Sequence, residues 1–530
     1  MNNTKNILLP IVAGIALVIG ILMGINLSTK NTVNPRFNSS QSEKLLDIFN
    51  ILEHKYVDSI DKEELLETTI SEMLHRLDPH SNYIPARDLK RMSESIQGQF
   101  GGVGVRFAII RDTLNVTNVI EGSPADLSGV EKFDQIIKVD TVAIANTGLT
   151  NTKVQDLLKG NSGTNVEVTI LRGDDTVKLD IVRGMVPIKS LVASFMLNSN
   201  TGYMRLSSFS MTSDKEFLNA ALDLKKKGMN KLIFDLRYNG GGVMGAAINI
   251  CDALLPKGDK IVSTKGKNAG ETHEYSQNHP LFEDLDLVVL INQSSASASE
   301  IVAGAIQDND RGTIIGRRSF GKGLVQQDIE LKDGSNLRLT TSRYYTPTGR
   351  SIQKPYTGDY EDYLMDEINR YEHGELYEID SSIFVDSLRF TTPGGKTVYG
   401  GGGIMPDLFI PIDTIGFSGY FRRLQYANAF ADFAYDYAKN HNLTKEFKSP
   451  KNFYKRFKIT DQLFGSLMEY ALENYDIQRN ETAANQSKQL IINNLKAELA
   501  RQIWLENGSL YVASQTDHMI DKALSVLKEK

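Results

Sequence analysis

The apolar run at residues 287–291 constrains the fold more than any other feature, because a segment of serines and small residues follows it. Residues 294–300 read Ser-Ser-Ala-Ser-Ala-Ser-Glu. A short apolar run in this position predicts a buried strand. Ser297 with Glu300 three positions later matches a capping box, which predicts the start of a helix. The sequence therefore predicts a strand, a short loop and a helix, as in an α/β core.

Ser297 at this junction is expected near helix N-terminal amides, which favour developing negative charge. Lys322 stands between two glycines further along the chain, in Ser-Phe-Gly-Lys-Gly at residues 319–323. A hydroxyl is a poor nucleophile at neutral pH, and a neutral amine beside it can accept its proton. The pair predicts a serine nucleophile with a lysine base. Each residue also has an ordinary explanation, because Ser297 fits a helix cap and Gly-Lys-Gly fits an exposed turn.

Six motifs surround these two residues and extend from residue 77 to residue 407. They are Leu-Asp-Pro-His-Ser at 77–81, Asp-Leu-Arg-Tyr-Asn-Gly-Gly-Gly at 235–242, Ser-Ala-Ser-Ala-Ser-Glu at 295–300, Phe-Gly-Lys-Gly-Leu-Val-Gln at 320–326, Gly-Arg-Ser-Ile-Gln at 349–353 and Gly-Gly-Gly-Ile-Met-Pro-Asp at 401–407. Together the motifs resemble those of the carboxyl-terminal processing protease family, the tail-specific Ser-Lys peptidases. The resemblance spans roughly residues 43–412. Gly240 departs from it, because the family usually has proline there.

The resemblance implies a role for each site residue. Ser297 is expected to be the nucleophile, Lys322 the general base, and Gln326 the group that orients the lysine. No cofactor and no metal ion is implied, and the histidines do not form the zinc pattern His-Glu-x-x-His. The oxyanion is expected to be held by backbone amides of the helix start and of the glycine loop, from Ala298 and from Gly241 and Gly242.

Two distances bear on these roles. If residues 297–308 form one helix, Asp308 lies about 16 Å from Ser297 at ~1.5 Å per residue, so Asp308 is expected to be structural. In a regular strand Lys322 and Gln326 would lie about 13 Å apart at ~3.3 Å per residue. The glutamine therefore reaches the lysine only if the chain bends near Gly323. A lysine base also requires burial that lowers its pKa from about 10.4.

Residues 96–186 resemble a PDZ domain. Gly-Gly-Val-Gly-Val at 101–105 resembles its carboxylate-binding loop, and Gly-Ser-Pro-Ala-Asp-Leu-Ser-Gly-Val at 122–130 resembles its helix region. Consecutive backbone amides in such a loop form an anion-binding nest, and the next strand adds a peptide to the edge of the sheet. Phe133 departs from the pattern, which has glycine before the aspartate. The expected peptide-binding residues are Gly102, Val103, Gly104 and Val105.

The N-terminal residues predict the compartment. Residues 7–27 are mostly apolar and have about the ~20 residues needed to cross a bilayer. Lys5 precedes them, so the short side is expected in the cytoplasm and the rest of the chain on the exported, periplasmic side of the inner membrane. No convincing Ala-x-Ala cleavage site follows. We expect an uncleaved anchor over residues 1–30, and a removed signal peptide is the alternative.

The fold class expected for the whole chain is α+β multidomain. After the anchor, residues 31–95 form a linker and a helical segment, residues 96–186 the PDZ domain, and residues 187–412 an α/β peptidase core, which the resemblance implies is ClpP/crotonase-like. Residues 413–530 show three or four helical patterns and are expected to pack on the core or to form a contact between copies of the chain. A net charge of −6 argues against nucleic acid as a partner.

These inferences predict a membrane-anchored serine endopeptidase that binds free protein C-termini through a PDZ domain and cleaves with a Ser-Lys dyad. Its task would be the processing or degradation of exported proteins. Two alternatives remain open. The first is a catalytically silent PDZ scaffold that binds tails without cutting, which has no need of Ser297, Lys322 and Gln326 together. The second is a Ser-Lys amidase acting on small amides, which has no need of a peptide groove.

Overall fold

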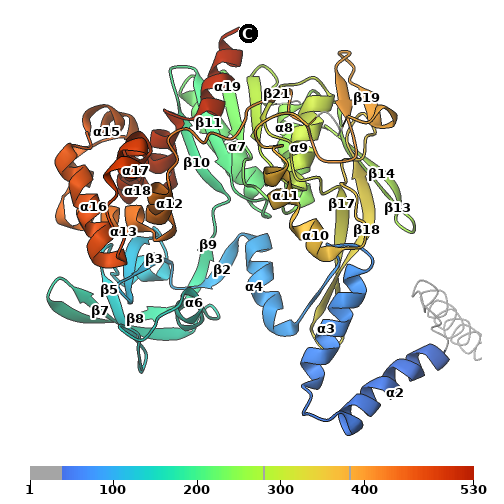
Figure 1. Cartoon of the computed structure of the whole chain (residues 1–530), viewed down its shortest axis with the longest axis horizontal. Helices are drawn as coiled ribbons and strands as arrows, with labels where there is room; N and C mark the ends of the chain where they lie inside the picture. Colours follow the sequence, from blue (N-terminus) through green and yellow to red (C-terminus); the bar gives the residue numbers. More distant parts are fainter. Residues whose placement is uncertain (1–38, 278–280, 381–383, 530) are drawn as a thin grey trace, which may run out of the picture. The chain divides into compact units, whose positions relative to one another are not determined.

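The computed structural model describes residues 39–277, 281–380 and 384–529 (Figure 1). The described chain divides into two units between Glu72 and Met73. The first contains α2 (Ser39–Lys55) and most of α3 (Lys62–His75). The predicted membrane segment of residues 7–27 lies outside the described residues. Within the described ranges, no helix is both long enough and apolar enough to span a bilayer.

An antiparallel sheet forms the PDZ domain. Its strands are β3 (Val105–Ile110), β4 (Thr113–Val119), β5 (Gln135–Val139), β6 (Val142–Ala143), β7 (Asn165–Arg172) and β8 (Asp175–Val182). The strand order β3-β4-β5-β7-β8 leaves β3 at an edge. Helices α5 (Pro124–Leu127) and α6 (Asn151–Leu158) accompany the sheet, and Val154 and Leu158 of α6 pack into its core. Where the chain enters and leaves the domain, β2 (Gln99–Gly102) pairs with β9 (Gly184–Pro187).

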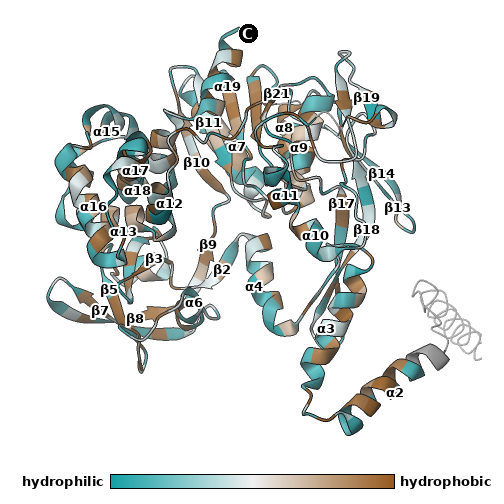
Figure 2. Ribbon diagram, in the orientation of Figure 1, coloured by the Kyte–Doolittle hydropathy of each residue, from teal (hydrophilic) through white to brown (hydrophobic). Residues whose placement is uncertain are grey.

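A six-stranded sheet organises the peptidase core. Its order is β10 (Leu191–Met196), β11 (Thr201–Leu206), β12 (Lys231–Asp235), β15 (Asp286–Ile291), β16 (Thr313–Gly316) and β21 (Leu408–Phe409). Neighbouring strands run parallel except for β10 and β11. Parallel strands covered on both faces are continuous apolar runs, and every residue of 287–291 is buried, as the sequence predicts. Figure 2 shows β10 as mainly hydrophobic.

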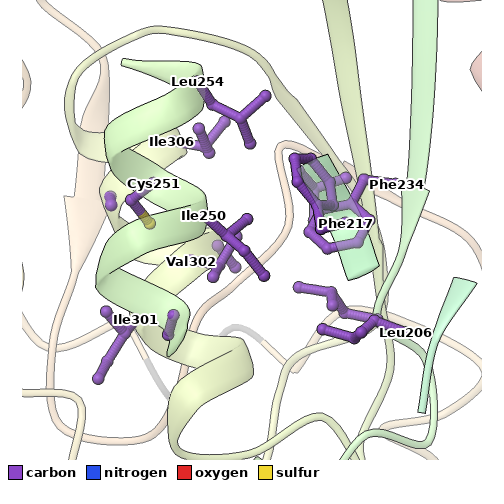
Figure 3. Packing of buried hydrophobic residues seen from close by; sticks show 14 of the residues in the cluster. Leu206, Phe217, Phe234, Ile250, Cys251, Leu254, Ile301, Val302 and Ile306 are labelled. Atoms are coloured by element: carbon purple, nitrogen blue, oxygen red, sulfur yellow. The ribbon is translucent and has the colours of Figure 1, made fainter. Parts of the chain in front are cut away.

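Helices cover both faces of this sheet. On one face lie α7 (Ser213–Lys226), α8 (Met244–Leu254) and α9 (Ala298–Asp308), whose side chains pack beside Phe217 and Phe234 (Figure 3). On the other face Ile233, Val288 and Leu290 pack against α19 (His518–Glu529) near the C-terminus. Each fully buried side chain of this size contributes about 1.5–3 kcal/mol. The sheet therefore depends on a helix from the far end of the chain.

A second, antiparallel sheet stands beside α9. It consists of β1 (Asn82–Ile84), β13 (Lys260–Gly266), β14 (Gly270–Tyr275), β17 (Leu324–Glu330) and β18 (Asn336–Tyr345). Strand β17 begins two residues after Lys322 and carries Gln326. Shorter elements join the sheets and the domains: α4 (Ala86–Gln97), α10 (Tyr360–Leu364), α11 (Asp366–Glu372), η3 (Asp386–Leu388), β19 (Arg389–Thr391) and β20 (Thr397–Tyr399).

The C-terminal extension has an aromatic core of its own, which includes Tyr420, Phe421 and Phe453. Its helices before α19 are α12 (Gly419–Tyr426), α13 (Ala429–Asn440), α14 (Leu443–Glu446), α15 (Pro450–Arg456), α16 (Asp461–Tyr475), α17 (Glu481–Gln486) and α18 (Lys488–Ser514). The sequence predicts three or four helical patterns here, whereas the described part of the extension forms eight helices. Several of them span only one or two turns, which is too short to produce a recognisable apolar period.

Candidate active site

Ser297 occupies the position before α9, at the end of the loop that leaves β15. Its backbone has φ 55° and ψ −113°, a left-handed conformation that is strained for a residue with a Cβ atom. The loop around it is fixed by hydrogen bonds from the Ser295 hydroxyl to the Leu236 carbonyl (2.8 Å) and from the Ser299 hydroxyl to the Asn239 carbonyl (2.8 Å). These contacts hold the backbone of Ser297 in its strained conformation, which persists only where the surrounding structure fixes it.

Glu300 provides the connection that sequence reasoning missed. Its fully buried carboxylate accepts hydrogen bonds from the amides of Ser297 (2.8 Å), Gly321 (2.7 Å) and Lys322 (2.9 Å) and from the Ser319 hydroxyl (2.5 Å). Burial raises the pKa of Glu300, and these four hydrogen bonds oppose that rise. The capping pattern identified Glu300 only as a helix residue, because nothing local indicates its contacts with the lysine segment.

The capping-box arrangement of Ser297 and Glu300 is present at the start of α9, although no hydrogen bond of the serine hydroxyl caps the helix. The Glu300 carboxylate accepts from the Ser297 amide, as in a capping box. The Glu300 amide donates to the carbonyl oxygen of Ser297 (2.8 Å), so this amide does not require the serine hydroxyl as its cap.

The amine of Lys322 donates to Oε1 of Gln326 at 3.0 Å. The expected bend is present, because β17 begins only at Leu324 and its register with β18 shifts between Val325 and Gln326. The amide nitrogen of Gln326 donates to the main-chain carbonyl of His80, which orients Oε1 toward the lysine. Burial, assisted by the positive charge of Arg338, lowers the pKa of Lys322 from its ordinary value. Lys322 therefore loses its proton more easily than a lysine exposed to water.

A cavity of about 480 Å³ brings the predicted residues together. Ser297, Lys322 and Gln326 line it with the glycine loop 240–242. Other lining side chains are mainly apolar, among them Ile96, Val243, Met244, Ile301, Leu324 and Val325. The cavity therefore combines a hydroxyl, an amine of lowered pKa and an apolar wall.

The glycine loop lies directly against Ser297. A Cβ atom on Gly241 would lie 2.8 Å from the Ser297 Cβ and 3.0 Å from the Ala298 nitrogen, so only glycine fits. The amide of Gly241 donates to Oδ1 of Asn239 (2.9 Å), which leaves the Gly242 amide as the better oxyanion donor from this loop. Ala298 opens α9, and the first amides of a helix have no partner within it.

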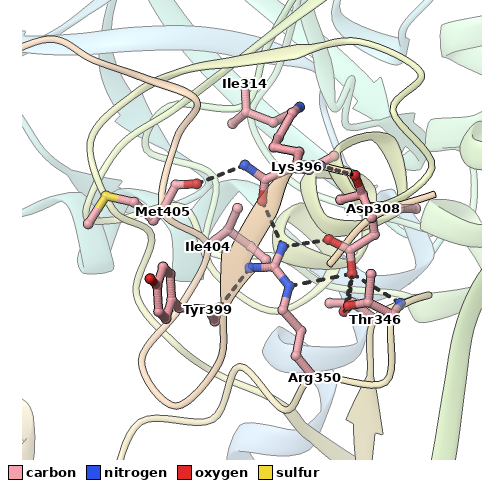
Figure 4. A network of polar contacts seen from close by, with 12 residues as sticks. Asp308, Ile314, Thr346, Arg350, Lys396, Tyr399, Ile404 and Met405 are labelled. Carbon is pink, nitrogen blue, oxygen red and sulfur yellow. Dashed lines mark hydrogen bonds and ion pairs between the residues drawn. The ribbon is translucent and has the colours of Figure 1, made fainter. Parts of the chain in front are cut away.

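Asp308 lies at the far end of α9, as its position in the sequence predicts. Its carboxylate forms a buried ion pair with Arg350 (2.7 Å), and both side chains are 0% exposed (Figure 4). The hydroxyls of Thr346 and Thr348 also donate to it. Asp308 thus fixes the chain after β18 and does not line the cavity at Ser297.

In the PDZ domain, a second cavity of about 250 Å³ lies between β3 and α6. Of the predicted loop residues, Val103, Gly104 and Val105 line it, whereas Gly102 is buried beside it. A Cβ atom on Gly104 would lie 2.3 Å from that of Ser123, so this position requires glycine. The remaining lining is mainly apolar, and the open edge of β3 can accept a peptide strand.

Comparisons with known families match four parts of the chain. Residues 200–361 match peptidase family S41, residues 101–182 a PDZ domain, residues 24–87 the N-terminal domain of the activating protease CtpB, and residues 420–505 a family of unknown function, DUF8443.

Two curated relatives are similar to this chain over most of their length. The carboxy-terminal-processing protease of Bartonella bacilliformis is 38% identical over 340 residues, which cover 63% of this chain and 76% of that protein. A probable CtpA-like serine protease of Staphylococcus aureus is 30% identical, with 64% of this chain and 68% of that protein covered. Among solved structures, the photosystem II D1 C-terminal processing protease is 29% identical, with 59% and 90% covered and a TM-score of 0.33.

Proposed function

This chain belongs to the carboxy-terminal-processing serine proteases of peptidase family S41, and on that basis we propose that it is a membrane-anchored endopeptidase that cleaves with a Ser297–Lys322 dyad. Membership gives the enzyme class, and the PDZ domain gives the capacity to bind peptide C-termini. The observation that carries the dyad is the position of Lys322. Its amine has a lowered pKa, is held by Gln326 and opens into the same cavity as Ser297.

The chemistry follows from these positions. Neutral Lys322 removes the proton of the Ser297 hydroxyl as the oxygen attacks the carbonyl carbon of the scissile peptide bond. The amides of Ala298 and Gly242 stabilise the oxyanion that forms. The lysine ammonium then gives its proton to the leaving amine, and an acyl-enzyme ester on Ser297 remains. Lys322, neutral again, activates the water that hydrolyses this ester.

Gln326 determines how the lysine works. One N–H of the amine donates to Gln326, so the lone pair of the neutral amine remains free to accept the serine proton. The Gln326 amide is itself held by the His80 carbonyl, so it presents its oxygen, and not its nitrogen, to the lysine. This arrangement suits an amine that alternates between the neutral and the charged form.

Tail recognition is the proposed basis of selectivity. The PDZ cavity is lined by apolar side chains such as Val105, Phe107 and Leu158, which suit an apolar C-terminal residue. Backbone amides near Gly102 to Gly104 can bind the terminal carboxylate. Substrates are therefore proposed to be polypeptides with a free, apolar C-terminus.

The proposed location rests on the sequence. Residues 7–27 supply an apolar span of sufficient length behind Lys5, so the catalytic domain is proposed to lie on the exported side of the inner membrane. Membrane fractionation with mass spectrometry of the mature N-terminus tests this. A mature start near residues 25–40 would contradict the anchor.

The decisive experiment compares variants on an unfolded test protein with an apolar C-terminus. Ser297→Ala and Lys322→Arg should abolish cleavage, because arginine keeps its charge and cannot act as a base. Ser294→Ala is the matched control, since Ser294 lies three residues before Ser297 and does not line the cavity. Cleavage by Ser297→Ala at the wild-type rate would contradict the proposal and favour a catalytic site elsewhere in the chain. Absence of cleavage by the wild type, with tail binding intact, would favour the silent scaffold.

A further inference from the structure

Tyr344 lies at the point where the two catalytic segments meet. It belongs to β18, is 1% exposed, and its ring packs in the main apolar core. Its amide donates to the carbonyl oxygen of Gly323 (3.0 Å). Its hydroxyl donates to the main-chain carbonyl of Lys322 (2.7 Å) and shares its proton with the carbonyl of Ser297 (3.1 Å).

Glu300 makes the complementary contacts. The amides of the same two residues, Ser297 and Lys322, both donate to its Oε2, at 2.8 Å and 2.9 Å. The Glu300 carboxylate thus holds the main-chain amides of Ser297 and Lys322, and the Tyr344 hydroxyl holds their main-chain carbonyls. One of these side chains comes from α9 and the other from β18.

We propose that Tyr344 is a positioning residue that, opposite Glu300, holds the main chain of Ser297 and the main chain of Lys322 in the relative position that proton transfer requires. The proposal rests on the Ser297–Lys322 dyad proposed above. The two residues come from different sheet systems, since Ser297 follows β15 whereas Lys322 precedes β17. Nothing in the covalent chain fixes the distance between them, although catalytic geometry must be held within about 0.5 Å.

The hydroxyl of Tyr344 is suited to this role. Burial, followed by the negative charge of Glu300, raises the pKa of Tyr344 well above its ordinary value, so the hydroxyl keeps its proton and remains a donor. Since that proton is already engaged by two carbonyl oxygens, Tyr344 has no donor left for a substrate oxyanion. Its contribution is therefore to geometry and not to the reacting atoms.

The test is Tyr344→Phe, which removes the hydroxyl and keeps the buried ring. A displacement of the order of 1 Å at a catalytic pair lowers the rate by about 100-fold, so kcat should fall by about 10- to 100-fold while KM stays within about 3-fold. The pH of half-maximal inactivation by a fluorophosphonate should also rise, because a less firmly held Lys322 becomes better hydrated. A purely structural loss would leave that pH unchanged.

Tyr420→Phe is the matched control. Tyr420 is equally buried, and its hydroxyl donates to the sulfur of Met468 within the C-terminal extension. It should lose a comparable amount of stability and keep the wild-type kcat. Rates are normalised to active sites titrated with the fluorophosphonate, and folding is checked by thermal melting and by binding of a tail peptide.

A kcat of Tyr344→Phe within about twofold of the wild type, with the pH of inactivation unchanged, would overturn the positioning role. Ser297→Ala is measured in the same assay, so an inactive Ser297→Ala beside a fully active Tyr344→Phe removes only this inference and leaves the dyad. If Tyr344→Phe does not fold, kcat is measured for Glu300→Gln instead. This variant perturbs the contacts with the main-chain amides of Ser297 and Lys322, opposite those of Tyr344. A wild-type kcat for Glu300→Gln would overturn the inference as well.

Discussion

Replacing Asp308 by alanine should destabilise the peptidase core and leave its chemistry intact. Arg350 would become an unpaired charge in a site where both side chains are 0% exposed. Removing one partner of a buried ion pair costs about 3–5 kcal/mol. The two threonine hydroxyls that donate to Asp308 would also lose their acceptor, so the upper part of this range is expected.

The assay is thermal unfolding followed by circular dichroism or calorimetry. A core of this size changes its Tm by ~2–4 °C per kcal/mol, so Asp308→Ala should lower the Tm of the core transition by about 6–20 °C. Asp223→Ala is the control, since Asp223 and its partner Lys226 are both more than half exposed. An exposed pair contributes at most about 1 kcal/mol. The double variant Asp308→Leu with Arg350→Met should recover much of the loss, because it leaves no buried charge.

Activity distinguishes a structural Asp308 from a catalytic one. Measured well below the lowered Tm and per titrated active site, kcat should match the wild type, because α9 separates Asp308 from Ser297 by about 16 Å. A variant with unchanged Tm and a kcat reduced tenfold or more would refute the structural assignment. It would place Asp308 in the proton transfer itself.

Three further outcomes are expected. The kcat/KM of the wild type should rise with pH as Lys322 loses its proton, with a midpoint below 10.5, and a midpoint at or above 10.5 would contradict the buried base. Amidating the C-terminus of a peptide substrate should lower kcat/KM at least about tenfold, since 1.4 kcal/mol corresponds to that factor; equal rates would exclude the PDZ domain from selection. Burial and the charge of Lys322 lower the pKa of His80 from 6.5 to about 3, so the folded state keeps His80 neutral. This contribution to the free energy of unfolding is complete above pH 6.5 and decreases toward pH 3. The urea midpoint should therefore fall more between pH 7.5 and pH 5 in the wild type than in His80→Gln.

Local patterns in the sequence predict the buried strand before Ser297 and the start of the helix after it. The run at 287–291 is a fully buried strand, and Ser297 stands between it and α9. These predictions succeed because a buried strand and a helix start each have a short-range signature. The resemblance to family S41 is confirmed by the relatives, and it supplies the lysine and the glutamine that periodicity alone does not identify.

Contacts between distant segments could not be predicted in this way. The sequence indicates neither that Glu300 binds the amides of the lysine segment nor that Tyr344 bridges two carbonyl groups. It also leaves open which glycine amide is free, which depends on the side chain of Asn239. The contacts of Glu300 and Tyr344 depend on how two sheets are placed against each other, whereas the contact of Asn239 lies within its own loop. Burial of a carboxylate or of a hydroxyl has no local signature in the chain.

The C-terminal extension illustrates the same limit and connects it with function. Its helical patterns predict that apolar faces are buried, but they do not identify the surface against which each face packs. In the structure, α19 covers the second face of the six-stranded sheet. Just before α19, Asp517 binds the guanidinium of Arg237 at 2.7 Å, and Arg237 also binds Asp235 at 2.7 Å. Arg237 directly precedes the loop that carries Gly242. The start of α19 therefore restrains, through one arginine, the loop that carries glycines 240–242. The C-terminal extension thus contributes to the geometry of the candidate site.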